Sequence, residues 1–225
     1  ALDGATAHAF AHILYKGLLF MCAGGVMVAT GKRLLSDMGG LYRVMPLTLG
    51  CCIVGALAIS AFPLTSGFTT KAMIDDAVAL HAGTLAAGGL DASRFAWVWL
   101  GLEIASAGVF LHAGIKFPWF VFFNGERDWK VSEPPRPMRM AMLGLAALCL
   151  LLGVFPQPLY AMLPYGAAQT EFWPHVYSLA NLAGTLALLL FSGAAFFVLL
   201  PALKRKRTVT LDFDWFWRAF PRLVW

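Results

Sequence analysis

Ionisable side chains recur at a fixed spacing inside the first apolar stretch of this 225-residue chain. His8, His12 and Lys16 follow one another at intervals of four residues, so they lie on one face of a helix over two turns. Histidine exchanges protons near neutral pH, and a lysine that is removed from water gives up its proton more readily. A row of such groups, linked by water, is what a proton relay requires.

Two further apolar stretches carry groups of the same kind. Lys71 lies in one of them, and Glu103, His112 and Lys116 lie in the next. An ionisable side chain at membrane depth costs at least a few kcal/mol, so such residues usually mark a functional site. We therefore predict that all seven ionisable residues belong to a proton relay that uses no covalent catalytic residue.

Structural explanations remain open for several of these residues. Lys116 lies near the end of its segment, from which a lysine can extend its ammonium to the membrane surface. His8 is equally compatible with a hydrogen bond between packed helices. His8 and His12 have the spacing of a metal-binding pair, but HAFAH lacks the glutamate of the HExxH motif, so we predict no metal site. Lys16 and Lys71 lie near the middle of their segments, where function is the stronger explanation.

The elements that carry these groups are apolar enough to cross a bilayer. The chain is 60% hydrophobic and 13% charged, whereas soluble domains have about 25% charged residues. Its apolar runs reach about 20 residues, the length that crosses about 30 Å of hydrocarbon. The sequence predicts an all-α integral membrane protein with about six transmembrane helices, over approximately residues 5–30, 46–62, 64–87, 95–123, 138–155 and 176–203.

The third of these stretches is expected to be discontinuous. Pro63 and Gly67 interrupt it, and proline both removes a backbone donor and obstructs the preceding turn. Backbone carbonyls freed next to Lys71 are suited to hold water or a cation. Further along, Asp75, Asp76 and His81 are interpreted as the solvated end of this helix.

The formal net charge of +5 does not predict a nucleic-acid partner. The basic residues flank apolar runs, in the loop 124–139 and in the cluster 204–207, where they act as topology signals and contact anionic lipid. We therefore predict a transmembrane bundle over residues 1–203 and a basic, aromatic tail over residues 204–225 at the membrane surface.

The first helix and the loop after it resemble a known family. The motif HxxxKxxLFxxAG, the loop TG…GGL…MP and the segment ALAISAFPLTSGFTTKAMI occur here in the order of the proton-conducting antiporter-like membrane subunits. Respiratory complex I and the multisubunit Mrp-type cation/proton antiporters share these subunits. The stretches HAGIKFPWFVFF, GVFPQPLYAMLPY and LDFDWFWR look most like the D-type subunits of the Mrp-type group.

The resemblance implies the second inverted repeat of this fold, that is the C-terminal half, with a trailing helix. Lys16 would match the lysine of the family's middle helix, His12 the histidine one turn before it, and Lys71 the lysine of the broken helix. His112 and Lys116 match the HAGIK pattern of the subgroup. The glutamate–lysine pair of the family's first repeat is absent from this sequence.

The implied function is proton translocation by a secondary transporter subunit of the cell membrane, which is not an enzyme and needs no cofactor. Its partners would be other membrane subunits, protons, monovalent cations and lipid. The alternative is a non-transporting structural or assembly subunit of such a complex or of a complex I-like assembly. A relay requires water-linked spacing around Lys16 and Lys71, whereas a scaffold would pair each charge with a carboxylate.

Overall fold

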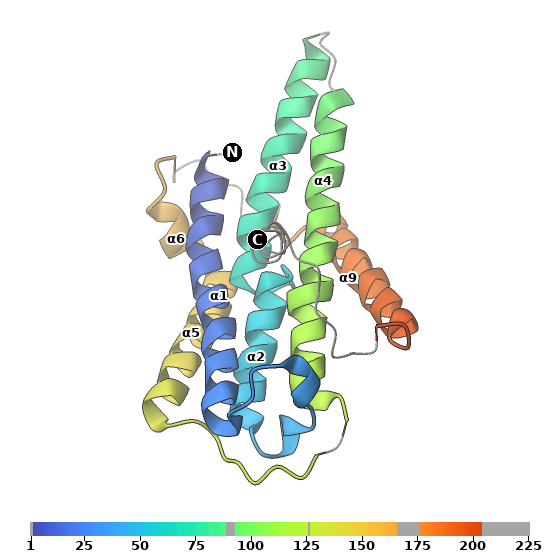
Figure 1. Ribbon diagram of the computed structural model, residues 1–225. Coiled ribbons are helices and arrows are strands. Elements are labelled where there is room, and N and C mark those ends of the chain that lie inside the picture. The colour runs from blue at the N-terminus through green and yellow to red at the C-terminus, as the bar shows by residue number, and fades with distance from the viewer. Residues whose placement is uncertain (1, 89–92, 126, 166–175, 204–225) are drawn as a thin grey trace, which may run out of the picture.

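The computed structural model describes residues 2–88, 93–125, 127–165 and 176–203, and within them the regular structure is entirely helical. Figure 1 shows the bundle. The predicted apolar segments correspond to α1 (Leu2–Thr30), α2 (Pro46–Ile59), α3 (Ser66–Ala87), α4 (Ser93–Val109) with its π-helical continuations η3 (Phe110–Lys116) and η4 (Trp119–Phe123), α5 (Arg136–Val154) and α9 (Leu179–Leu199).

Four of these helices have the length and apolar composition to cross a membrane. They are α1, the continuous helix Phe95–Phe123, α5 and α9. The predicted all-α membrane fold is thereby confirmed. Shorter elements join them: the 3₁₀ turns η1 (Leu35–Asp37) and η2 (Leu41–Arg43), and the helix α6 (Gln157–Ala161). The predicted tail, residues 204–225, lies outside the described part of the chain.

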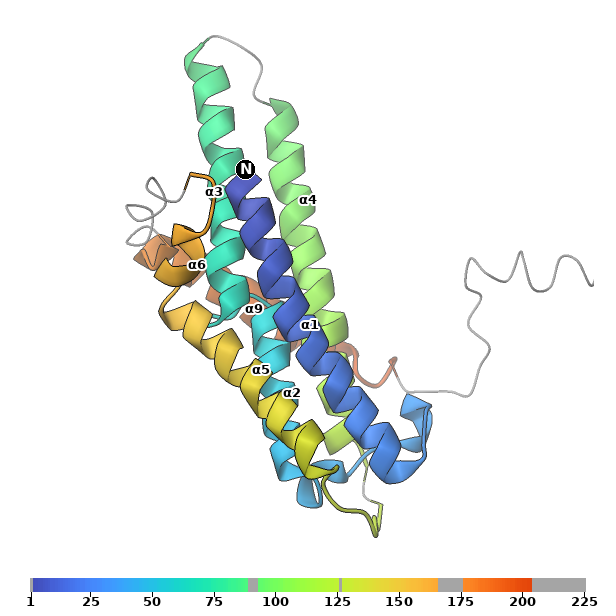
Figure 2. The ribbon, with the colours of Figure 1, turned by 90° about the vertical axis from the view of Figure 1, so that its left-hand side faces the viewer.

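The broken helix consists of α2 and α3 together, and this corrects its predicted extent. The 14 residues of α2 reach only about 21 Å, which is short of a membrane crossing. In Figures 1 and 2 α3 continues upward from the end of α2 along the same direction. The break therefore runs from Ser60 to Thr65 and joins two half-helices, whereas the sequence placed it at Pro63 and Gly67, in the third apolar stretch.

The backbone enters the left-handed region of φ twice within this break. Ala61 and Leu64 both have positive φ, at 55° and 67°, a region that costs non-glycine residues about 1–2 kcal/mol each. Pro63 lies between them and Ser66 begins α3. Gly67 is already inside the first helical turn, so it lies next to the break rather than in it.

Two glycines allow neighbouring backbone to close on the break. A Cβ on Gly67 would overlap the carbonyl oxygen of Ala58, at the end of α2. A Cβ on Gly153, in α5, would overlap the backbone of Leu64 and Thr65. The half-helices and α5 are therefore packed too closely there for any side chain.

The main core lies where α1 packs along α2 and α5. Tyr15, Leu18 and Met142 are each at most 2% exposed. All four cysteines are buried and none forms a disulfide bond: Cys22, Cys51, Cys52 and Cys149. Because α1 also packs against α3, it runs beside both halves of the broken helix.

The polar loop after η4 binds the connection between α1 and α2. Arg127 donates to the carbonyl oxygens of Ser36 and Asp37. The indole of Trp129 donates to the carbonyl of Gly39 at 2.7 Å. These bonds fix the end of α1 relative to the helix Phe95–Phe123.

Glu133 holds the first turn of α2. One carboxylate oxygen accepts from the backbone N–H of Leu47 at 2.6 Å and of Thr48 at 3.2 Å, and the other accepts from the Thr48 hydroxyl at 2.5 Å. A carboxylate is favourable here because the first N–H groups of a helix lack intrahelical acceptors. Glu133 thus positions the half-helix that leads into the break.

Candidate functional site

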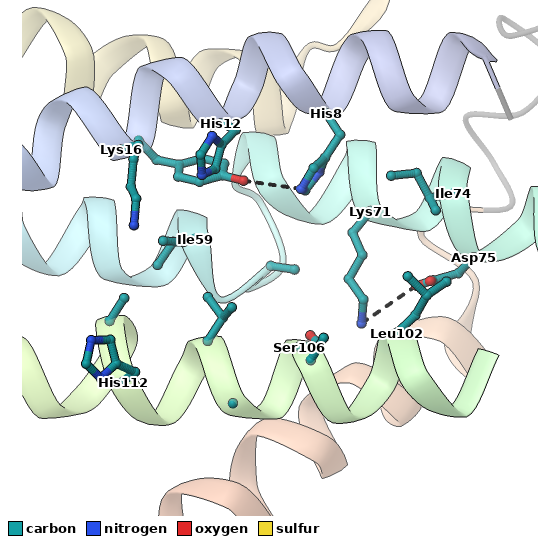
Figure 3. Close-up of a pocket in the computed structure, with 16 residues that line it drawn as sticks. His8, His12, Lys16, Ile59, Lys71, Ile74, Asp75, Leu102, Ser106 and His112 are labelled. Carbon is teal, nitrogen blue, oxygen red and sulfur yellow. Dashed lines mark hydrogen bonds and ion pairs between the residues drawn. The ribbon is translucent and has the colours of Figure 1, made fainter. Parts of the chain in front are cut away.

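A cavity of about 610 Å³ opens between α1, α3 and α4, beside the break. Figure 3 shows its ionisable residues on three separate elements. Five of the seven predicted relay residues line it: His8, His12 and Lys16 from α1, Lys71 from α3, and His112 from η3. Its remaining walls are mostly apolar. The break contributes Ala61, and α2 contributes Ile59.

Lys71 is held between two carboxylates from different helices. Its Nζ lies 3.2 Å from Glu103 Oε1, on α4, and 3.6 Å from Asp75 Oδ2, one turn along α3. The three side chains are only 16–22% exposed, so screening by water is weaker than at the surface. This triad has a net negative charge and joins α3 to α4.

Asp75 was assigned to a solvated helix end from the sequence, and the structure corrects that assignment. Its Oδ1 is buried and has no hydrogen-bond partner within the described residues, and its Oδ2 faces Lys71. The four-residue spacing of Lys71 and Asp75 would have indicated this contact, because residues at that spacing meet on a helix.

His8 bridges α1 and α3 through hydrogen bonds. Its Nδ1 lies 3.0 Å from the Thr70 hydroxyl, and its Nε2 lies 3.4 Å from the Tyr15 hydroxyl. Tyr15 also makes an edge-to-face contact with His12, with ring centroids 5.3 Å apart. Neither Thr70 nor Tyr15 could be singled out from the sequence, since a lone hydroxyl in an apolar helix gives little signal of its own.

Lys16 has surroundings unlike those of Lys71. Its side chain is exposed and, within the described residues, makes no ion pair or hydrogen bond. In Figure 3 it points from α1 toward the helix that carries His112, which is likewise exposed. Among the described residues, Asp75 is the only carboxylate that lines this cavity, and it already faces Lys71.

A second hollow, of about 220 Å³, adjoins the first at Lys16 and His112 and reaches Lys116. A third, of about 230 Å³, shares Phe117 with the second and reaches Arg33, in the loop after α1. The hollows follow one another from the broken helix toward the end of α1. Lys116 does not line the main cavity but lies along this series.

His112 and Lys116 lie on η3, where the helix widens to π geometry. Single π-helical turns are uncommon and occur often at functional sites. Gly114, between the two residues, approaches the Ser60 hydroxyl so closely that a Cβ there would overlap it. The π segment therefore packs directly on the first residue of the break.

Comparison with known proteins identifies the fold that carries this site. Residues 1–96 match the family described as "NADH:quinone oxidoreductase/Mrp antiporter, TM". These residues belong to this family. The match contains His8, His12, Lys16, Lys71 and the whole break between α2 and α3, whereas Glu103, His112 and Lys116 lie beyond it.

Individual members of the family show the same relationship. The A-type Na(+)/H(+) antiporter subunit of Alkalihalophilus pseudofirmus is 32% identical over 165 residues, which is 69% of this chain and 20% of that protein. Hydrogenase-4 component B of Escherichia coli is 32% identical over 156 residues, covering 68% and 23%. The N-type NADH-quinone oxidoreductase subunit of Desulforudis audaxviator is 39% identical over 107 residues, covering 48% and 19%.

The matched region is less than a quarter of the length of each of these relatives. A solved structure of the Mrp complex from Dietzia sp. DQ12-45-1b aligns with 84% of this chain and 40% of that chain, at 22% identity and a TM-score of 0.49. Family membership makes the chain a multi-pass protein of the plasma membrane, as the sequence predicted. The narrower assignment to the D-type subunits stays a prediction.

Proposed function

We propose that this chain translocates protons across the membrane, as one component of a multisubunit monovalent cation/proton antiporter. The observation that carries the proposal is the cavity between α1, α3 and α4, which brings Lys16 and Lys71 together with His12 and His112. Four proton-exchanging groups on three elements around one hollow are suited to stepwise transfer through water.

The two lysines would have different tasks in this relay. Lys71 lies between the carboxylates of Asp75 and Glu103, so we assign it to the charge-paired end of the relay. Within the described residues no carboxylate faces Lys16, so we assign it the role of the site that exchanges protons with the cavity. A proton would move between them through the cavity with His12 and His112 as intermediate sites, and would reach the loop end of α1 along the hollows past Lys116.

The proposed partners follow from the names of the relatives. The curated relatives include sodium/proton antiporter subunits and components of NADH-quinone oxidoreductases, which are parts of larger assemblies. We therefore propose that this chain acts as a secondary transporter subunit rather than as an enzyme. Its partners would be other membrane subunits, with lipid around them and with protons and monovalent cations as substrates.

A second candidate is a structural or assembly role, and one observation favours it. Lys71 is paired with two carboxylates on two helices, as expected of a charge that holds helices together. Lys16 distinguishes the candidates, because a scaffold would have paired it as well.

The test is cation-driven proton flux in vesicles that contain the whole complex. Lys16→Ala and Lys71→Ala are compared with the wild type at equal assembly, and Lys32→Ala, on an exposed loop lysine outside the cavity, is the matched control. We expect flux to be lost in the first two variants and kept in the control. Flux that survives both changes would reject the relay and favour the scaffold. If Lys71→Ala does not assemble, Lys71→Arg replaces it in the comparison because it keeps the positive charge. Flux in Lys16→Ala then decides between the relay and the scaffold.

A further inference from the structure

His8 differs from the other two histidines of the cavity in the use of its ring nitrogens. Both nitrogens of His8 have a hydroxyl partner, Thr70 at Nδ1 and Tyr15 at Nε2. His12 and His112 make no hydrogen bond within the described residues. A relay residue must take a proton at one atom and release it at another, so the direction of the bonds to His8 decides what it can do.

The hydroxyl of Thr70 fixes the bond at Nδ1. Its Oγ1 lies 3.0 Å from the carbonyl oxygen of Ser66 and 3.4 Å from that of Gly67. Two oxygens this close need a proton between them, and the only one available is the hydroxyl proton of Thr70. With its proton used in this way, Thr70 can only accept from His8, so His8 carries its proton on Nδ1.

The same reasoning assigns the bond at Nε2. A neutral imidazole with a proton on Nδ1 has its lone pair on Nε2. The hydroxyl of Tyr15 is therefore the donor to Nε2. Tyr15 is itself 2% exposed and lies between the rings of His8 and His12. His8 can gain a second proton only at Nε2, from the side of Tyr15.

A proton that entered at Nε2 has no onward route. Release from Nδ1 would lead to Thr70, whose own proton is directed at backbone carbonyl oxygens, and a carbonyl has no proton of its own to pass on. The hydrogen-bonded series Tyr15, His8, Thr70 and Ser66 therefore ends at the backbone of α3.

We infer that His8 is a terminal proton acceptor, positioned by Thr70 and Tyr15, and not a residue through which protons pass. This inference rests on the proposed function and removes His8 from the through-route, which would run between Lys16 and Lys71. Within the described residues, the ionisable groups around it are His12 and Tyr15 of α1 and Lys71 of α3. Thr70 and Tyr15 thereby become positioning residues of the site.

The tautomer can be measured without any transport assay. Solid-state ¹⁵N NMR on the whole complex in liposomes, with labelled histidine, distinguishes a protonated from an unprotonated ring nitrogen. The His8 signals are identified by their loss in His8→Asn. We expect Nδ1 to be protonated in the wild type and in Thr70→Ser, and a mixture of tautomers in Thr70→Val. A wild-type His8 with its proton on Nε2 would overturn the inference.

Flux measurements test the terminal position. His8→Asn keeps an N–H near the place of Nδ1 but cannot take up a proton. Because it loses only the contact with Tyr15, flux should fall by no more than about threefold at equal assembly. Loss of flux as complete as in Lys16→Ala would show that protons pass through His8 and would overturn the inference. Should flux instead survive in Lys16→Ala, the proposed function fails, while the NMR result on the tautomer stands independently.

Discussion

Lys16 and Lys71 line the same cavity, yet their surroundings are opposite. Lys71 lies between two carboxylates, with 16% of its side chain exposed, next to a break that is packed too closely for side chains at Gly67 and Gly153. Lys16 is exposed, has no ion pair within the described residues, and adjoins two hollows. We call the surroundings of Lys71 and the break the closed region, since its charges are paired and its backbone is closely packed. We call the surroundings of Lys16 the open region, since Lys16 is exposed and faces no counter-charge within the described residues.

This difference separates two uses of a charged residue in an apolar setting. A paired charge holds elements together, because removing one partner leaves the other without compensation. An unpaired charge contributes little to stability, so its retention has to be explained by what it exchanges. The contrast predicts that variants of the closed region damage the fold, and that variants of the open region damage only transport.

The largest loss of stability is expected for Lys71→Ala. It leaves Asp75 and Glu103 facing each other without a counter-charge, which should lower the free energy of unfolding by about 2–3 kcal/mol. Thermal unfolding of the purified complex measures this loss. Adding Glu103→Gln to Lys71→Ala should recover part of it, since one of the two repelling charges is removed. A single variant as stable as the wild type would show that the triad does not hold α3 to α4.

Gly67→Ala is expected to come next. Its Cβ would overlap a backbone oxygen of α2, which cannot move as a flexible side chain can, so we expect a loss of about 2 kcal/mol. Gly24→Ala, on α1, is the control, because nothing lies within 4 Å of a Cβ added there. Alanine at this position should be neutral or stabilising by up to about 1 kcal/mol. Equal stability of the two variants would remove the distinction between a closely packed break and an open face.

The sequence predicted the open region better than the closed one. The row His8, His12 and Lys16 could be found from helical spacing alone, and the apolar runs gave the membrane-spanning helices. The closed region depends on contacts between residues far apart in the chain. Gly153 packs on the break from α5, and Glu103 pairs with a lysine 32 positions earlier. Such contacts leave no periodic pattern within a single segment, so they could not be predicted from helical spacing.

The break itself was predicted from Pro63, but its two sides were assigned incorrectly. Residues 46–62 looked like a complete helix because their composition is uniformly apolar, although α2 ends at Ile59. Its incomplete length becomes evident only when α3 is seen to continue it. Composition measures whether a segment can enter a membrane, and not whether it crosses alone.

A smaller loss, about 1 kcal/mol, is expected for Glu133→Gln. Glutamine can still accept at one oxygen, but it loses the negative charge at the start of α2 and places an amide where an acceptor is needed. Asp128→Asn, on an exposed carboxylate of the same loop, should change stability by less than about 0.5 kcal/mol. Chemical denaturation of both variants measures the difference. A matching loss in Asp128→Asn would attribute the effect to net charge and not to the cap.

The smallest change in stability should accompany the loss of transport. Lys16→Ala removes an exposed side chain that has no ion pair or hydrogen bond within the part of the chain that the structure describes. We therefore expect the free energy of unfolding to stay within about 0.5 kcal/mol of the wild type, while cation-driven flux disappears. Lys16→Arg keeps the charge but holds its proton at all accessible pH values. It should therefore be as inactive as Lys16→Ala, because a relay needs a site that releases its proton. Flux restored by arginine would mean that only a fixed positive charge is needed at this position, and the contrast between the charge-paired Lys71 and an exchanging Lys16 would fail.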